Sequence, residues 1–220
     1  MKKGDFVTIN YIGKIEESGE LFDTTKEEVA EKRNALNPNA KYEPVTVIVG
    51  AEMVLPGVEE QLEEMEVGEE REFELPPEKA FGERDSDNIE THPERKFEDQ
   101  GMTPYSGMRV NINGRVGRIL SVSSGRVKVD LNHPLAGKTL EYELEVSEKI
   151  EEEEEKVKAV VSYYLSDSAD VEIEDGKATV TVEKEVPEQI QEEIENKLVE
   201  YTEVEEVEFI QGEKDEDQSE

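Results

Sequence analysis

The sequence predicts an α+β protein built on an antiparallel sheet that a separate module interrupts. Residues 140–146 alternate apolar and polar side chains, as a half-buried strand does, but no neighbouring segment matches them. Their best-matched partners lie far upstream, at residues 6–12 and 70–75. Residues 84–130 hold eight basic and seven acidic side chains within a chain of net charge −33. A near-neutral island inside an acidic chain indicates an inserted domain.

The first part of the chain alternates between strands and short helices. Val58, Leu62 and Met65 recur at helical spacing, and Pro56 and Gly57 mark the start of that helix. We therefore expect, in chain order, a strand at 5–12, a hairpin turn at 16–20, a short helix at 26–34, a strand at 44–50, a helix at 58–65 and a strand at 71–75 that ends at two prolines.

The inserted module carries the signals of a small antiparallel sheet. Asn113-Gly114 and Ser123-Ser124-Gly125 separate alternating segments, and such dipeptides favour hairpin turns. We expect a short strand and helix within 89–97, then strands at 108–112, 116–122 and 126–130. The turn at 132–138 then returns the chain to the first domain, where the strand at 140–146 closes the split sheet.

A small C-terminal α+β module follows an acidic run at 151–155, which is either a linker or the solvated start of a helix. The run Glu174-Asp175-Gly176-Lys177 predicts a hairpin between strands at 169–173 and 178–183. Pro187 opens a helix that carries Ile190, Ile194 and Leu198 on one face, and residues 204–210 alternate as a last strand. An open face of this sheet suits a homodimer.

These signals divide the chain into five parts. We expect a split first domain at 1–83 and 131–150, an insert at 84–130, a C-terminal α+β domain at 151–212 and a disordered acidic tail at 213–220.

Composition excludes several classes of function. The chain has no Cys, which rules out disulfides, thiol nucleophiles and Cys-ligated zinc. Its negative charge disfavours nucleic acid and anionic membrane surfaces as partners. No segment approaches the ~18 apolar residues of a membrane span, so we expect a cytoplasmic protein. His92 and His133 each precede a proline and fit structural roles better than catalytic ones, and we expect no metal and no cofactor.

The remaining candidates for chemistry are apolar and aromatic side chains at the ends of strands, together with one carboxylate. Each of them alone fits core packing, but they come from segments that lie far apart in the sequence. They are Tyr11, Phe22, Asp23, Val45, Val54, Leu55, Val58, Phe81 and Tyr142.

The motifs around these residues resemble those of the FKBP family of peptidyl-prolyl isomerases. The resemblance covers about one hundred residues, and its motifs are Tyr11-Ile12-Gly13, the G-x-x-F-D run at 19–23, the pocket-helix segment at 50–59, Val67-Gly68-Glu69, Ala80-Phe81-Gly82 and Tyr142. It implies an FKBP-like antiparallel sheet wrapped on a short helix. It also implies that the nine candidates form a pocket for X-Pro bonds, in which Asp23 is the polar element and the Leu55 N–H binds a substrate carbonyl.

The position of the insert resembles that of SlyD-like and long archaeal FKBPs, in which an insert-in-flap domain implies a chaperone site. The partners would then be unfolded proteins and proline-containing peptides. The apolar candidates for client binding are Ile89, Phe97, Met102, Tyr105, Met108, Val110, Ile112, Val116 and Ile119, although Met102 and Met108 fit a small core equally well. The histidine-rich metal tail of SlyD is missing, so nickel handling does not carry over.

Three positions depart from the family pattern. Val58 replaces the tryptophan floor, Val45 replaces a phenylalanine wall and Phe81 replaces a tyrosine that would bind a carbonyl. These changes argue against tight binding of macrolide inhibitors and for a lower isomerase efficiency. The favoured hypothesis is an isomerase that is also a chaperone. The alternatives are a pure holdase with a vestigial pocket and an acidic structural adaptor.

Overall fold

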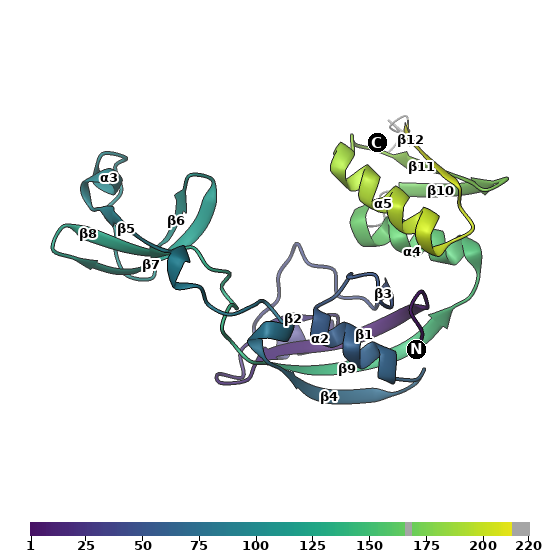
Figure 1. Cartoon of the computed structure of the whole chain (residues 1–220), viewed down its shortest axis with the longest axis horizontal. Helices are drawn as coiled ribbons and strands as arrows, with labels where there is room; N and C mark the ends of the chain where they lie inside the picture. The colour runs from purple at the N-terminus through teal and green to yellow at the C-terminus, as the bar shows by residue number, and fades with distance from the viewer. Residues whose placement is uncertain (166–168, 213–220) are drawn as a thin grey trace, which may run out of the picture. The chain divides into compact units, whose positions relative to one another are not determined.

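The computed structural model describes residues 1–165 and 169–212. The chain divides into two compact units: Met1–Leu75 with Leu140–Glu220, and Pro76–Thr139 (Figure 1). An inserted unit therefore interrupts the first unit between its fourth strand and its long closing strand. The predicted tail at 213–220 lies outside the described residues.

The first unit is built on an antiparallel sheet in the order β2-β1-β9-β4, with β3 paired to the other half of β1. Two short helices, α1 (Glu27–Lys32) and α2 (Pro56–Glu64), lie between its strands in sequence. The strands are β1 (Phe6–Ile15), β2 (Leu21–Thr24), β3 (Val45–Ile48), β4 (Glu70–Leu75) and β9 (Leu140–Ile150). This architecture confirms the predicted fold class.

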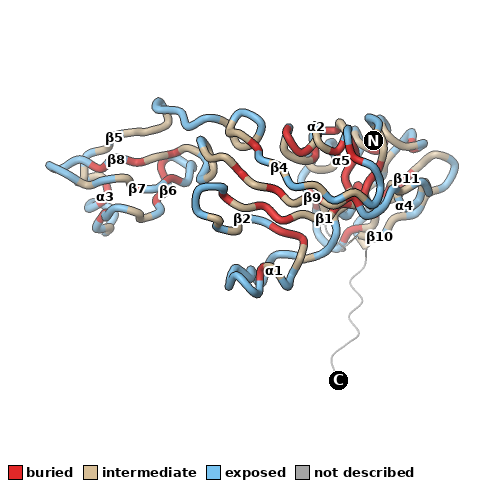
Figure 2. Tube along the Cα trace, turned by 90° about the horizontal axis from the view of Figure 1, so that it is seen from below, coloured by how far each residue is buried: buried red, intermediate tan, exposed pale blue. Residues whose placement is uncertain are grey.

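The long strand β9 joins the two halves of the split sheet. Along β1 it pairs from Phe6 opposite Ile150 to Ile15 opposite Leu140, and along β4 it pairs Leu75 with Leu140. Buried and half-buried residues alternate along residues 140–146 of β9 (Figure 2), as the period of two in this sequence predicts. Strand β1 keeps this alternation only in part, because Phe6 and Val7 are both buried, as are Ile12 and Gly13. The upstream partners predicted for residues 140–146 are therefore confirmed.

Helix α2 turns its apolar face into this core. Val58, Leu62 and Met65 are all buried, as the helical spacing predicts. Pro56 occupies the first turn, where its missing N–H costs no helical hydrogen bond. The start of α2 is therefore held in place by its own buried face.

The inserted unit contains an antiparallel sheet in the order β5-β8-β7-β6. Asn113-Gly114 and Ser124-Gly125 all have positive φ, as tight hairpin turns require. The elements are the 3-10 turns η1 (Pro77–Lys79) and η2 (Ser86–Asn88), strand β5 (Ile89–Pro93), helix α3 (Arg95–Glu98), and strands β6 (Arg109–Ile112), β7 (Arg115–Ser123) and β8 (Arg126–Asp130). The small sheet predicted from the turn signals is present.

The C-terminal module consists of two helices and a three-stranded sheet. Its elements are α4 (Glu153–Leu165), β10 (Ala169–Glu174), β11 (Lys177–Val182), α5 (Glu188–Tyr201) and β12 (Glu206–Gln211). β10 and β11 form the predicted hairpin, while β12 runs parallel to β11 after the crossover through α5. Of the acidic run at 151–155, Glu153, Glu154 and Glu155 form the first turn of helix α4.

The module packs on the first sheet domain within the same unit. Helix α4 contacts β3, β10 and α5, and α5 contacts β12. Among the described residues no helix is both long and apolar enough to cross a membrane.

Candidate functional site

Four aromatic rings gather at the middle of the first sheet, around Tyr142 on β9. The Tyr142 ring centroid lies 6.1 Å from that of Tyr11, 5.9 Å from that of Phe22 and 5.9 Å from that of Phe73. Tyr142 is buried, and Phe22 and Tyr11 are half-buried. Strands β1, β2, β4 and β9 each contribute one ring, so the cluster depends on the register of the whole sheet.

Gly13 makes room for this cluster. It lies opposite Tyr142 in β9 and opposite Asp23 in β2. A Cβ atom at this position would lie 2.6 Å from Cζ of Phe22, which is closer than any stable packing contact. The Phe22 ring therefore lies over the strand only because residue 13 has no side chain.

Asp23 carries the polar chemistry at the edge of the cluster. Its Oδ2 accepts a hydrogen bond of 2.9 Å from the Tyr11 hydroxyl, and its Oδ1 accepts one of 2.9 Å from the Thr24 N–H. Burial, and next the adjacent Asp23 carboxylate, raise the pKa of Tyr11 well above its usual value of 10.0. Burial likewise raises the pKa of Tyr142. Both phenols therefore remain protonated hydrogen-bond donors at any physiological pH.

Two buried threonines fix the backbone of Tyr11. The Tyr11 N–H donates to Oγ1 of Thr25 at 2.9 Å, and Oγ1 of Thr24 donates to the Tyr11 carbonyl at 2.8 Å. Both side chains are less than a tenth exposed. Thr24 and Thr25 thus fix the backbone of Tyr11, whose hydroxyl binds Asp23.

The start of α2 supplies a free backbone donor. The Leu55 carbonyl accepts hydrogen bonds from the N–H groups of Val58 and Glu59, whereas the Leu55 N–H donates to no acceptor in the described part of the chain. The Glu59 carboxylate accepts the N–H groups of Gly50 and Met53, which ties down the preceding loop. Val54 and Leu55, which precede α2, are half-buried, and Val58 in the first turn of α2 is buried.

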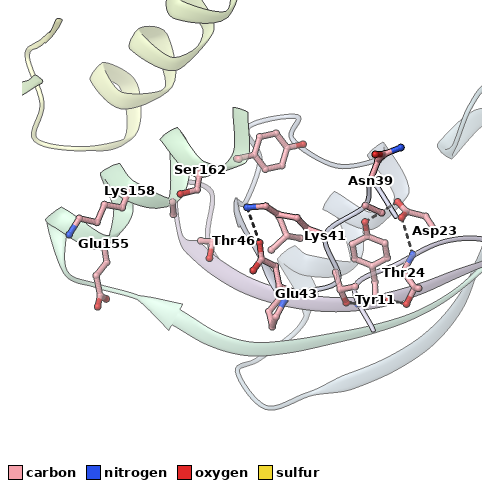
Figure 3. Close-up of a pocket in the computed structure, with 16 residues that line it drawn as sticks. Tyr11, Asp23, Thr24, Asn39, Lys41, Glu43, Thr46, Glu155, Lys158 and Ser162 are labelled. Carbon is pink, nitrogen blue, oxygen red and sulfur yellow. Dashed lines mark hydrogen bonds and ion pairs between the residues drawn. The ribbon is translucent and has the colours of Figure 1, made fainter. Parts of the chain in front are cut away.

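A cleft of about 620 Å³ opens beside Tyr11 and Asp23 (Figure 3). Val45 and the loop before it form part of its lining. In Figure 3 the Tyr11 hydroxyl points to the Asp23 carboxylate, while α4 of the C-terminal module runs along another side. The full lining is Tyr11, Asp23, Thr24, Thr25, Asn39, Ala40, Lys41, Glu43, Pro44, Val45, Thr46, Glu155, Lys158, Ala159, Ser162 and Tyr163.

The structure brings several of the predicted site residues together. Tyr11, Phe22, Asp23 and Tyr142 form one cluster, and Val45 shares the cleft with two of them. Phe81 belongs to the inserted unit, where its ring stacks on His133 with centroids 4.3 Å apart. His133 also accepts the Leu135 N–H through Nδ1, as a turn residue does. The sequence reasoning had given no site role to Gly13, Phe73 or α4.

The inserted unit distributes its nine apolar candidates between core and surface. Tyr105 and Val116 are 64% and 67% exposed. Met102 and Met108 are partly buried against the core, and Ile89 is half-buried. The other four lie inside the core, namely Phe97, Val110, Ile112 and Ile119.

Metal-binding geometry is missing from the parts of the chain that the structure describes, since no three His, Asp or Glu side chains converge there. His92 is half-buried and places Nε2 2.8 Å from a carboxylate oxygen of Glu90. Its ring also meets that of Phe97 edge to face. The surroundings of His92 are therefore those of a packed residue.

Comparison with known proteins agrees with this geometry. Residues 92–135 match the family model described as the FKBP26 IF domain. The chain is 40% identical over 146 residues to the short-type peptidyl-prolyl cis-trans isomerase of Methanocaldococcus jannaschii, a match that spans 66% of this chain and 92% of that protein.

Bacterial relatives show the same family. The chain is 33% identical over 130 residues to the FKBP-type peptidyl-prolyl cis-trans isomerase SlyD of Helicobacter pylori, which covers 57% of this chain and 70% of that protein. It is 34% identical over 108 residues to a probable FKBP-type 16 kDa isomerase of Pseudomonas fluorescens, covering 47% of this chain and 71% of that protein. The chain therefore belongs to the FKBP-type peptidyl-prolyl cis-trans isomerases and carries an insert-in-flap domain.

Proposed function

We propose that the chain isomerises X-Pro bonds in the pocket built around Tyr11, Phe22 and Tyr142, and that it holds unfolded chains with its inserted domain. The observation that carries the first part is the Tyr11 hydroxyl bound to Asp23 at the rim of an aromatic cluster. Such a site combines an apolar floor with one oriented polar group, as a binding site for a prolyl ring requires.

Removal of water explains how this pocket lowers the barrier. Rotation about the X-Pro bond is opposed by amide resonance, with a barrier of roughly 18–20 kcal/mol. The twisted transition state has lost that resonance and is less polar than the planar ground state. An apolar environment therefore favours the twisted form over the planar one. In this proposal Val45, Val54 and Val58 complete the apolar surface.

The polar groups orient the substrate. The Leu55 N–H has no acceptor within the described chain and can bind a substrate carbonyl. Asp23, held by Tyr11, faces the cleft and orients the twisted amide. An acceleration of several thousandfold requires the pocket to stabilise the transition state by roughly 5 kcal/mol. Apolar contacts and one or two hydrogen bonds can supply this without a cofactor.

The inserted domain supplies affinity for unfolded clients in this proposal. The exposed Tyr105 and Val116 are the main contacts, and the partly buried Met102, Met108 and Ile89 are adaptable neighbours. Phe97, Val110, Ile112 and Ile119 hold the domain together from its core. A client held by the same chain presents its prolines at a raised effective concentration.

A homodimer through the C-terminal module is a further part of the proposal. The open sheet face carries Asp170, Glu172, Glu206 and Glu208, so two such faces would repel each other. The outer edges of β10 and β12, in contrast, pair with no other described strand. We therefore place the contact at a sheet edge, and sedimentation velocity over a range of concentrations tests it.

A refolding assay limited by proline isomerisation tests the isomerase site. We expect Asp23→Ala and Phe22→Ala to slow catalysed refolding strongly, while Asp99→Ala in the inserted domain leaves it unchanged. If both pocket variants refold the substrate as fast as wild type, the pocket is vestigial and the pure-holdase alternative holds. Suppression of aggregation, measured on the same variants, should stay intact because it depends on the insert.

A further inference from the structure

Helix α4 belongs to the C-terminal module, but its side chains line the cleft beside Tyr11 and Asp23. Glu155, Lys158, Ala159, Ser162 and Tyr163 line the same cleft as Tyr11, Asp23 and Val45. Figure 3 labels Glu155, Lys158 and Ser162 on this helix. A volume of about 620 Å³ suits a ligand much larger than one prolyl ring. The cleft therefore has room for residues that flank the proline, and α4 is the wall that would meet them.

Tyr163 also reaches the loop that leads to the pocket helix. Its hydroxyl donates a hydrogen bond of 2.5 Å to the Met53 carbonyl, two residues before Leu55. Burial, and next the Glu59 carboxylate, raise the pKa of Tyr163, so this donor stays protonated. On the neighbouring helix, Lys197 donates to the Ala51 carbonyl.

The loop is thus held from two sides. Glu59 of α2 binds the N–H groups of Gly50 and Met53, and the C-terminal module binds the carbonyls of Ala51 and Met53. Val54 and Leu55 follow directly, and the Leu55 N–H is the donor assigned to the substrate carbonyl. Two helices of the C-terminal module therefore hold the loop that leads to that donor.

We propose that α4 is a working part of the isomerase site, with Tyr163 as a positioning residue for Val54 and Leu55 and with the face around Ser162 as a subsite for polypeptide residues beside the proline. This inference rests on the proposed function of the pocket. It assigns the C-terminal module a role in substrate binding, in addition to any role in assembly.

Two tyrosine variants test the positioning role. Tyr163→Phe removes the hydroxyl that binds Met53, whereas Tyr164→Phe removes a neighbouring hydroxyl that has no acceptor in the described chain. We expect Tyr163→Phe to raise KM for short X-Pro peptides about two- to tenfold with little change in kcat, because it weakens binding of ground and transition states alike. Amide exchange at residues 53–55 should become faster in the same variant only.

Two phenylalanine variants test the subsite. Ser162→Phe fills the cleft from α4, while Asn196→Phe adds the same ring to an exposed position on α5 outside that lining. We expect Ser162→Phe to lower kcat/KM for a ten-residue proline peptide at least fivefold more than for a tetrapeptide. Asn196→Phe should change neither value.

The outcomes separate the two levels of the proposal. If the wild-type chain accelerates no X-Pro peptide, the proposed function of the pocket fails. If the wild type and Tyr164→Phe are active but Tyr163→Phe has the same KM and the same amide exchange, the positioning role is wrong. If Ser162→Phe affects long and short peptides equally, α4 is no subsite.

Discussion

Phe73 stacks on Tyr142 across strands β4 and β9, with ring centroids 5.9 Å apart and planes inclined by only 9°. Tyr142 lies in turn against Tyr11 and Phe22. Phe73 therefore supports the pocket ring from the side away from β1, although its own sequence position marks it only as a strand residue.

Replacing Phe73 with Leu should weaken both the sheet and the pocket. The change keeps most of the apolar area but removes the stack, which contributes about 1 kcal/mol beyond burial. We expect urea denaturation to show that loss and peptide kinetics to show a raised KM, since Tyr142 becomes mobile. Phe209→Leu on β12 is the matched control and should leave KM unchanged.

Gly13→Ala should displace the Phe22 ring, because the added Cβ would lie 2.6 Å from it. Overpacking of this kind costs about 1–3 kcal/mol of folding free energy. We expect a lower melting temperature and a large loss of kcat/KM. The double variant Gly13→Ala/Phe22→Leu should regain stability but not activity; recovery of neither would show that the clash is not with Phe22.

Tyr11 and Asp23 should behave as one unit in a double-mutant cycle. Tyr11→Phe removes the donor of their shared hydrogen bond, and Asp23→Ala removes its acceptor. We expect each to lower kcat/KM about tenfold and the double variant to lose much less than the product of the two effects. Independent effects on peptide isomerisation would contradict this coupling.

Asp130 should make the inserted domain sensitive to acid. Burial alone would raise the pKa of this carboxyl, but hydrogen bonds from Asn132 and Arg84 outweigh it and hold the pKa below 3.8. The stabilisation is thus complete above about pH 4 and is lost as pH falls through the lowered folded pKa. Asp130→Asn should lower the free energy of unfolding of the inserted domain by about 1–2 kcal/mol at pH 7 and should weaken its dependence on pH in the acidic range. Amide exchange in β8 measures both effects. Asp99→Asn, in an exposed pair with Arg95, should do neither.

Because the proposal assigns isomerisation to the pocket and client binding to the insert, variants should lose one activity without the other. Tyr105→Ser/Val116→Ser should abolish most of the suppression of client aggregation and leave short-peptide isomerisation unchanged. Leu36→Ser/Val67→Ser, at exposed apolar positions of the other unit, is the control. If suppression survives the first pair, the client site lies elsewhere.

Much of this architecture is readable from local pattern. Strand periodicity, the positive-φ turns at Asn113-Gly114 and Ser124-Gly125, and the apolar face of α2 follow rules that need only neighbouring residues. The long-range partners of β9 were predicted as well, because only residues 6–12 and 70–75 match its alternation. The sequence does not decide whether residues 151–155 start a helix, because this run of five Glu residues carries no apolar side chain and the buried Val157, Val160 and Val161 come only after it.

The remainder of the site depends on register and tertiary contact. Gly13 and Phe73 acquire their roles only because both lie opposite Tyr142, and a pairing register cannot be read from either segment alone. The approach of Tyr163 to Met53 joins residues 110 positions apart in two modules. No local pattern encodes such a contact.

The position of β9 has a consequence for synthesis on the ribosome. The strand that completes the isomerase sheet is made only after the whole inserted unit, Pro76–Thr139, has been translated. Its pairing with β1 spans most of the chain made so far and is slow to form, whereas the insert closes through short hairpins. The insert can therefore fold first in the nascent chain, while the edge of β1 that β9 later covers is still unpaired.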